Sequence, residues 1–405
     1  MSVEKFIRKE LISSTPQSST RVRIVDAPNT ISLAAGDPSF KLPKYVADAV
    51  YKAIKDGYTH YCFGGDPDFK LAISNYYEKQ YGYKADPEKQ IVVTSGGSGS
   101  IFAGYGAILN QGDEVIALDP AYGGGSMAPA YFGAKTVFAS MEKKPGGVFR
   151  FNESALKAAI TPKTKALYIE NPGNPSGIVY TKNELKAIAD LAVDHDFEVL
   201  SDETYSEYIW GRRKHSTLID IPGMEERTIV AMALTKMFAW AGMRTGWTIA
   251  GPKLTAYINR VPGSGASWPI MKGAIAALNG PRDFIEGEKK EYEERLDYGV
   301  KRLNEIPGIK CVKPEGAFYL FPDITGTGLT SDDFVRGLME KQHIRIASGR
   351  GYGVGNGEGN VRLSMIRPLS TQKMPGWFKV TKRTCFEAAM DRIEKFVRTQ
   401  KPKKK

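Results

Sequence analysis

From about residue 90, short apolar runs alternate along the chain with segments of helical periodicity. Six apolar runs predict strands, within residues 90–97, 113–122, 164–177, 197–205, 227–236 and 246–252. Two segments between them, 100–110 and 183–196, predict helices. This alternation predicts an α/β domain with a mostly parallel sheet covered on both faces. Right-handed crossovers would bring the loops after the strands to one edge, where such sheets bind ligands.

A different pattern follows Gly280-Pro281. A long charged helix is predicted over 282–306, and the shorter apolar segments after it predict a smaller α+β domain, with pieces at 311–324, 331–343, 344–349, 360–365 and 382–400. We therefore expect a large domain at 46–280 and a small C-terminal domain at 281–405. Residues 1–45 are expected to form an N-terminal arm and part of the small domain.

Composition limits the classes of function. The net charge is +11, but 56 basic residues face 45 acidic ones, and part of the excess lies in the tail RTQKPKKK. Such a tail is typical of a solvated chain end, so no nucleic acid partner is expected. The three cysteines are far apart, no HExxH spacing occurs, and no run reaches membrane-spanning length. These features predict a cytoplasmic protein without a metal or a membrane segment.

Candidate binding or catalytic residues follow four of the predicted strands. Glycines at 96, 97 and 99 in TSGGSGS precede a helix, an arrangement that suits a phosphate, although a plain tight turn has the same pattern. Tyr122 in DPAY could stack on a planar ring or pack into the core. Asn174 lies between the prolines of NPGNPSG, which would hold its amide or merely form a connecting loop. In SDETY, Asp202 ends an apolar strand, where it could act chemically or cap a helix.

Lys236 is the most informative residue of the chain, because it lies in the apolar stretch ALTKMFAWAGMRTGW. A lysine in an apolar pocket has a lowered pKa and can form a Schiff base with an aldehyde. A carboxylate, an aromatic ring, an amide, a phenol, a glycine loop and the arginine Arg244 accompany it. Together these groups describe a site for pyridoxal 5'-phosphate.

The ordered series of motifs resembles the fold-type I pyridoxal phosphate enzymes, and within them the class I/II aminotransferases of the aspartate and aromatic type. The matching segments span nearly the whole chain: LAAGDPSF, YTHYCFGGDPDFKLAI, VTSGGSGS, DPAY, NPGNPSG, SDETY, LTKMFAWAGMRTGW, PEGAFYLF and GNVRLS. The resemblance implies a seven-stranded sheet in the large domain, a homodimer and pyridoxal phosphate as cofactor.

The resemblance also implies residue roles. Lys236 would carry the cofactor, Asp202 would pair with its ring nitrogen, and Asn174 and Tyr205 would bind its ring hydroxyl. The phosphate would be bound by a group of residues from several loops: Gly97, Ser98, Gly99, Thr235, Arg244 and a tyrosine of the partner subunit. Arg362 would bind the substrate α-carboxylate, with the backbone near Gly36 closing over it.

Two positions depart from the family pattern. Ala233 stands where members often have a hydroxyl residue on the phosphate, which predicts weaker cofactor binding. The segment HYCFGG is one residue shorter than in common members, so either Tyr61 or Tyr58 could be the intersubunit phosphate ligand, and we favour Tyr61.

The predicted activity is transfer of the amino group of an L-amino acid to a 2-oxo acid such as 2-oxoglutarate. Aspartate and aromatic amino acids are both candidate donors: Tyr58, Tyr122 and Trp240 would favour aromatic side chains, and Arg212, Arg213 or Lys272 a second carboxylate. A β-lyase or an aminocyclopropane carboxylate synthase on the same fold is the main alternative. A cofactor-sensing transcription regulator is a more distant one.

Overall fold

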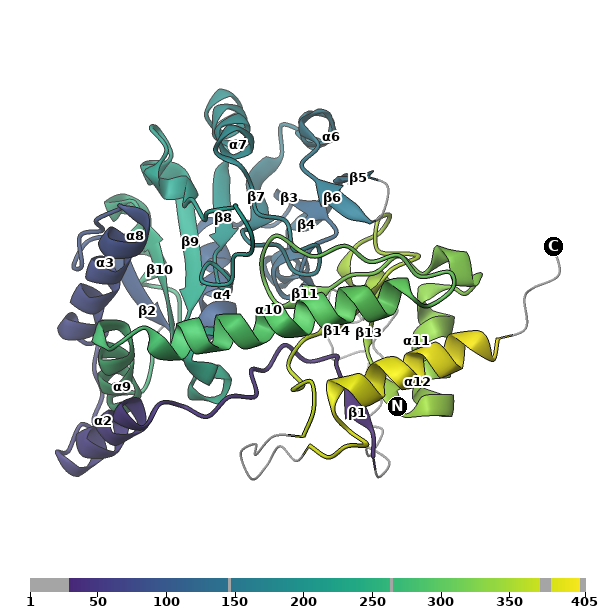
Figure 1. Cartoon of the computed structure of the whole chain (residues 1–405). Helices are drawn as coiled ribbons and strands as arrows, with labels where there is room; N and C mark the ends of the chain where they lie inside the picture. Colours follow the sequence, from purple (N-terminus) through teal and green to yellow (C-terminus); the bar gives the residue numbers. More distant parts are fainter. Residues whose placement is uncertain (1–28, 145–146, 263–264, 372–379, 401–405) are drawn as a thin grey trace, which may run out of the picture.

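The computed structural model describes residues 29–144, 147–262, 265–371 and 380–400, and a seven-stranded sheet lies at its centre (Figure 1). The strands follow one another across the sheet in the order β2 (Ile91–Thr94), β10 (Gly246–Ala250), β9 (Thr228–Ala233), β8 (Glu198–Asp202), β7 (Thr164–Glu170), β3 (Glu114–Asp119) and β4 (Lys135–Ser140). Strand β10 is antiparallel to both neighbours, and the other pairs are parallel. The predicted α/β fold with a mostly parallel sheet is confirmed.

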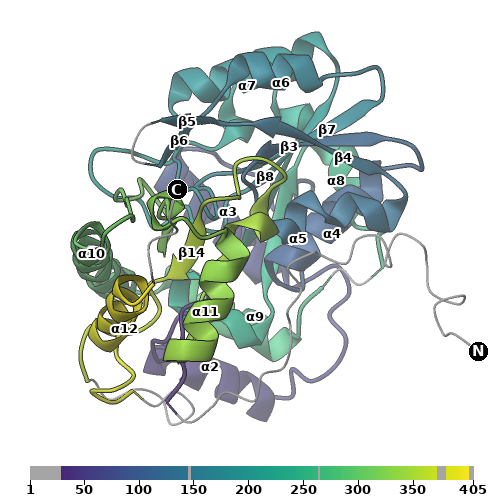
Figure 2. The ribbon, with the colours of Figure 1, turned by 90° about the vertical axis from the view of Figure 1, so that its right-hand side faces the viewer.

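Both faces of the sheet are buried, which explains why its strands read as nearly continuous apolar runs. Leu167 and Val199 are paired and face the same hydrophobic cluster, whereas Leu200 and Ile229 are paired and face another. The first face is covered by α3 (Pro67–Tyr81), α6 (Glu153–Ala159), α7 (Lys182–Asp194) and α9 (Trp268–Asn279), and the second by α4 (Gly96–Ile108) and α8 (Pro252–Ile258). Figure 2 shows α6 and α7 on one side of the strands and α4 on the other.

One strand of this sheet, β4, was not among the apolar runs that predict strands. It lies at the edge and pairs only with β3, and Ala139 is its single fully buried residue. Because β4 is partly open to solvent, its sequence KTVFAS lacks the apolar run that marks the buried strands, which include the other edge strand, β2. The helix α2 (Lys44–Lys55), the short helix α5 (Gly123–Ser126) and the hairpin of β5 (Glu142–Lys144) and β6 (Val148–Arg150) complete this part of the chain.

The C-terminal part has its own hydrophobic core. A three-stranded sheet has the order β11 (Tyr319–Leu320), β14 (Val361–Ser364) and β13 (Ala347–Ser348). It packs with α10 (Asp283–Asn304), α11 (Ser331–Gln342) and α12 (Phe386–Arg398). Figure 1 shows α10 running along the molecule from the region of α9 to α11 and α12. Accordingly, Ile285 of α10 belongs to a core cluster of the large sheet, and Tyr292 to the C-terminal core.

The segment before α2 crosses from the C-terminal part to the central sheet. Its strand β1 (Ile31–Ser32) pairs in parallel with β12 (Ile344–Arg345), and Leu33 accepts a hydrogen bond from the Ser364 N–H at 2.8 Å. Residues 1–28 of the predicted arm and the lysines at 401–405 lie outside the described residues. The domain limits at 45/46 and 280/281 stay a prediction. No helix of the described residues is long and apolar enough to cross a membrane.

Candidate functional site

The site lies at the edge of the sheet where β7, β8 and β9 end. Glu170 and Asp202 are the last residues of β7 and β8, and they are register partners, so their side chains leave the sheet on the same face. Lys236 follows the end of β9 and immediately precedes the short helix η5 (Met237–Ala239). The parallel topology thus brings together residues that are up to 66 positions apart, Glu170 and Lys236.

The amine of Lys236 is enclosed. Its Nζ donates a hydrogen bond to the backbone oxygen of Gly36 at 2.5 Å and lies 5.8 Å from the centre of the Tyr205 ring. Burial lowers the pKa of Lys236 to about 8, and the charge of Arg362 acts in the same direction, against Asp37 and Asp202. A sizeable fraction of the amine is therefore neutral near pH 8, which makes Lys236 a base and a nucleophile.

Asp202 lies in a buried and well-oriented position. Its Oδ1 accepts hydrogen bonds from the N–H and the hydroxyl of Thr204 at 3.0 and 2.6 Å, and its Oδ2 accepts one from Tyr168 at 3.3 Å. Burial raises the pKa of Asp202, and these donors oppose the shift. A cation placed beside this carboxyl would favour its ionised form.

Glu170 is a site residue that the sequence-based interpretation missed. Its two carboxyl oxygens accept the backbone N–H groups of Tyr122 and Asn174, at 2.5 and 2.6 Å. Burial, together with the nearby charge of Asp202, raises the pKa of Glu170 to about 8. The signal was present in the sequence, because Glu170 ends an apolar strand in the same way as Asp202 does.

Arg362 reaches the site from β14. It is buried, it donates to Asn174 Oδ1 at 2.9 Å and to the backbone oxygen of Ala34, and its Nε has no hydrogen-bond partner among the described residues. Its guanidinium carbon lies 4.3 Å from the ring centre of Tyr319 and 4.9 Å from that of Tyr352. This planar cation, with donor capacity left over, suits a carboxylate.

Gly36 and Tyr205 both lie next to the hydroxyl of Tyr319. The hydroxyls of Tyr205 and Tyr319 are 2.6 Å apart. A Cβ added at Gly36 would lie 1.9 Å from the Tyr319 hydroxyl, so only glycine lets the backbone pass this close. The structure thereby places Gly36, Tyr205 and Arg362 around Lys236.

The first turn of α4 forms another wall. A Cβ at Gly97 would lie 3.2 Å from the Thr204 hydroxyl and 3.7 Å from Ala233 Cβ, so this turn lies against the ends of β8 and β9. Arg244 donates to the backbone oxygen of Ser95, the residue before α4, at 3.2 Å. The glycine-rich helix start, Ser98 and Gly99 included, and the exposed Arg244 together suit an anion.

Other predicted residues lie differently. Tyr61 is 86% exposed and stacks on Phe63, which is 88% exposed, with 5.5 Å between ring centres. Tyr58 contacts Trp268 edge-on. Trp240 is fully buried in a core cluster, which argues against a direct contact with substrate.

The basic side chains proposed to bind a second carboxylate already have acidic partners in two cases. Arg213 pairs with Glu315 at 2.9 Å, and Lys272 pairs with Asp66 at 2.7 Å and with Asp68 at 3.1 Å. Arg212 is exposed. Within the residues that the structure covers, no cluster of three or more His, Cys, Asp or Glu side chains is arranged to hold a metal.

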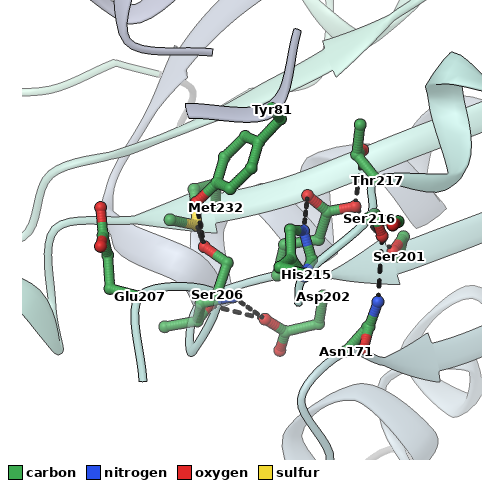
Figure 3. A network of polar contacts seen from close by, with 12 residues as sticks. Tyr81, Asn171, Ser201, Asp202, Ser206, Glu207, His215, Ser216, Thr217 and Met232 are labelled. Carbon is green, nitrogen blue, oxygen red and sulfur yellow. Dashed lines mark hydrogen bonds and ion pairs between the residues drawn. The ribbon is translucent and has the colours of Figure 1, made fainter. Parts of the chain in front are cut away.

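A second polar network supports the segment that carries Asp202. Glu203 accepts hydrogen bonds from Thr217 at 2.8 Å and Ser201 at 3.2 Å, and it lies 3.1 Å from His215. Figure 3 shows His215, Thr217 and Ser201 next to Asp202. Because this network is buried and well connected, it fixes the backbone from which Asp202 projects.

Comparison with known proteins identifies the family. A profile described as "Aminotransferase class I and II" matches residues 28–374. An aspartate aminotransferase of Pyrococcus abyssi is 36% identical over 379 residues, 92% of this chain and 93% of that protein. An aromatic-amino-acid aminotransferase of Thermococcus litoralis is 34% identical and covers 92% of each chain. The crystal structure of an aromatic aminotransferase from Pyrococcus horikoshii matches with a TM-score of 0.83 at 33% identity, over 92% of this chain and 96% of that one.

These matches extend over almost the full length of the chain, and the relatives named are transaminases, which supports neither the lyase nor the regulator alternative. The chain therefore belongs to the class I and II aminotransferase family and is an aminotransferase.

Proposed function

We propose that this aminotransferase binds pyridoxal phosphate at Lys236 and moves the amino group of L-aspartate or an aromatic L-amino acid to a 2-oxo acid such as 2-oxoglutarate. The family implies this cofactor. The observation that carries the proposal is the enclosed amine of Lys236, whose pKa is lowered to about 8 by burial and by the charges of Arg362 and Arg244, against those of Asp37 and Asp202.

The residues around Lys236 fit the cofactor. Thr235 Oγ1 is buried and has no hydrogen-bond partner in the described part of the chain, so it is available to a phosphate oxygen. The start of α4 at Gly97, Ser98 and Gly99 and the guanidinium of Arg244 offer further donors to the same group. The absence of a hydroxyl at Ala233 removes one contact.

The ring of the cofactor would meet four side chains. Asp202 would face its nitrogen, Asn174 and Tyr205 its hydroxyl, and Tyr122 one of its faces. Tyr122 is well placed for this role, because its backbone N–H is held by Glu170 and its phenol lies near Ser98. The carboxylate of Asp202 would stabilise a protonated ring nitrogen.

The chain supplies binding and proton transfer, while bound pyridoxal phosphate supplies a carbonyl for the amino group and a ring that takes up electrons. Arg362 would hold the α-carboxylate of the substrate through two parallel hydrogen bonds, which orients the bond from Cα to its hydrogen. Lys236 Nζ would take the proton from substrate Cα as a general base and later return a proton as a general acid. The backbone of Gly36 would close over the substrate.

The proposed donors rest on the relatives and on the lining of the site. Aspartate and aromatic aminotransferases are both among the similar proteins. The rings of Tyr319 and Tyr352 lie against Arg362, and the phenols of Tyr205 and Tyr122 are close enough to interact with its charge. Because Arg213 and Lys272 are engaged by acidic side chains, a dicarboxylate would have to compete with these pairs, which favours the aromatic donors.

We further propose a homodimer, in which Tyr61 reaches the phosphate in the partner subunit. Two stacked and almost fully exposed aromatic side chains, Tyr61 and Phe63, are costly in water and typical of a contact surface. The three free thiols, Cys62, Cys311 and Cys385, agree with the expectation of a cytoplasmic location.

A panel of L-amino acids assayed with 2-oxoglutarate tests the activity and the donor class together. The proposal predicts that glutamate and the matching oxo acid form in equal amounts, with aromatic amino acids or aspartate as the best donors. The variant Lys236→Ala is the control and should form neither product. Release of ammonia and pyruvate from β-substituted amino acids, without glutamate, would instead indicate a lyase.

A further inference from the structure

The hydroxyl of Tyr208 lies between two oxygen atoms that accept hydrogen bonds. It is 2.9 Å from the backbone oxygen of Lys236 and 2.8 Å from Glu288 Oε2. A phenol has one proton to donate, and a backbone carbonyl has none. Both short contacts are satisfied only when Tyr208 donates to Lys236 and a proton on Glu288 is donated to Tyr208.

The surroundings of Glu288 agree with a proton on its carboxyl. Glu288 lies on α10 and is 1% exposed, and its Oε1 has no hydrogen-bond partner among the described residues. The backbone N–H of Phe238 faces this carboxyl, but it makes no hydrogen bond of good geometry to Oε1. An ionised carboxylate in such a position would have one weak backbone donor for half of its charge, which is more costly than a weakly paired neutral oxygen.

The titratable and charged groups that face Glu288 are few. They are Tyr208 from the segment after β8, and Tyr292 and Arg295 from α10 itself. Arg295 is committed elsewhere, because it pairs with Glu291 and donates to the backbone oxygen of Met365 at 3.0 Å. Burial raises the pKa of Glu288 to about 8, against the opposing effects of the Tyr208 hydroxyl, the backbone N–H of Phe238 and the charge of Arg295.

We propose that Glu288 is a neutral carboxylic acid at physiological pH and that it positions the reactive lysine, through the chain of hydrogen bonds from Glu288 to Tyr208 to the backbone oxygen of Lys236. Glu288 and Tyr208 are positioning residues, since neither reaches the reacting atoms. The proposed function enters only through the role of Lys236. The position of the proton and its effect on the backbone do not depend on it.

The backbone after Lys236 needs such support. Phe238 and Ala239 have φ angles of 66° and 51°, in the left-handed region that residues other than glycine rarely occupy. A conformation of this kind persists only where neighbouring groups hold it. When Glu288 loses its proton, Tyr208 turns its own proton to the carboxylate, and the Lys236 oxygen loses its donor.

Infrared spectroscopy of the purified full-length protein locates the proton. The C=O stretch of a carboxylic acid is distinct from the bands of a carboxylate. The difference spectrum between wild type and Glu288→Gln at pH 7 should contain one carboxylic acid band, which disappears as the pH rises through about 8. Glu286→Gln, an exposed position on the same helix, should show no such band. Loss of only carboxylate bands in Glu288→Gln would overturn the proposal.

Hydrogen exchange detected by mass spectrometry tests the link to the lysine. In Tyr208→Phe, the peptide that spans 234–244 should exchange about fivefold faster than in wild type at pH 7, as expected for loss of one hydrogen bond of about 1 kcal/mol. Wild type should lose the same protection between pH 7 and 9, beyond the intrinsic pH effect seen in other peptides.

In Glu288→Gln, protection should persist at both pH values, because the amide donates to Tyr208 but does not titrate. Unchanged exchange in Tyr208→Phe, or a pH effect that survives in Glu288→Gln, would contradict the proposal. These outcomes are independent of transamination, so they remain distinct from a failure of the proposed activity.

Discussion

At the scale of single residues, the charge of Arg362 indicates most clearly which kind of ligand the site binds. Arg362 is buried, and within the described residues it has no ion pair with an Asp or a Glu; its partners are an amide, a backbone oxygen and tyrosine rings. A buried cation without a counter-ion is unfavourable, so the site is complete only with an anionic ligand. The α-carboxylate, which every amino acid and oxo acid substrate carries, supplies that charge.

Replacing Arg362 by lysine therefore weakens the binding of every substrate, whatever its side chain. An ammonium offers a point charge in place of two parallel hydrogen bonds, and the loss should be about 1.5–3 kcal/mol per hydrogen bond to a charged group. The measurement is kcat/KM across the amino acid panel, with cofactor binding nearly unchanged. An effect confined to acidic substrates would mean that Arg362 recognises the side chain instead.

The second prediction for a single residue concerns the carboxyl of Asp202. Burial raises the pKa of this carboxyl, and a cationic ring nitrogen beside it would favour the ionised form again. The variant Asp202→Ala should fold but lose at least about a hundredfold in turnover, the lower range for removal of one group that stabilises charge electrostatically. Turnover that stays at the wild-type level with saturating cofactor would remove Asp202 from this role, and circular dichroism serves as the control for folding.

At the scale of elements, the ends of β7 and β8 organise the loops around the cofactor position. Glu170 accepts an N–H from each of two loops, the one that carries Tyr122 and the one that carries Asn174. In Glu170→Gln, an NH₂ group replaces one of the two carboxyl oxygens, so the backbone N–H of Tyr122 or of Asn174 faces another donor and loses its acceptor. The affinity of the cofactor-free protein for pyridoxal phosphate should fall by about 1–3 kcal/mol, the cost of a buried group without a partner.

An absorbance titration with pyridoxal phosphate measures this loss. Glu198→Gln is the matched control, because Glu198 is the first residue of β8 and lies at the opposite end of this strand from Asp202. Its cofactor affinity should equal that of wild type. If Glu170→Gln bound pyridoxal phosphate as tightly as Glu198→Gln does, the contacts of Glu170 with the two loops would not contribute to cofactor binding.

The elements themselves were largely predictable, and the exceptions have physical reasons. Strands that are buried over most of their length, such as β7 and the edge strand β2, leave apolar runs in the sequence, whereas the partly open edge strand β4 does not. The segment IRIASG, expected only as a piece of the smaller α+β domain, forms two strands, β12 and β13, of two residues each, which pair with different strands. Such short pairings depend on neighbours far away in the sequence, and local patterns do not contain them.

At the scale of the whole molecule, the contacts that complete the site join distant parts of the chain. Arg362 meets Asn174 across 188 positions, and Tyr208 meets Glu288 across 80. Strand ends and a lysine in an apolar run point to Lys236 and Asp202 from the sequence alone. The role of Arg362 came from the family resemblance. Glu170 ends an apolar strand as Asp202 does and was overlooked, whereas the buried acid Glu288 became visible only when packing showed what surrounds it.

The exposed aromatic pair predicts the assembly. Tyr61 and Phe63 should be buried between two subunits, so sedimentation equilibrium should give twice the mass of 44.6 kDa for one chain. Replacing both residues by serine should shift the equilibrium toward the monomer and reduce activity at low protein concentration. The control is Tyr257→Ser, another exposed aromatic residue, far along the chain on α8. A wild-type monomer that stays fully active on dilution would contradict the dimer.

The central claim is that Lys236 is the residue that holds the cofactor, and one measurement tests it directly. The protein is loaded with pyridoxal phosphate and reduced with borohydride, which makes the bond between the lysine and the cofactor permanent. Peptide mapping by mass spectrometry should then find the modification on Lys236, since its enclosed amine has a pKa of about 8 and its neighbours suit the phosphate and the ring. A stoichiometric modification on Lys272 or another lysine, with Lys236 unmodified, would contradict the account.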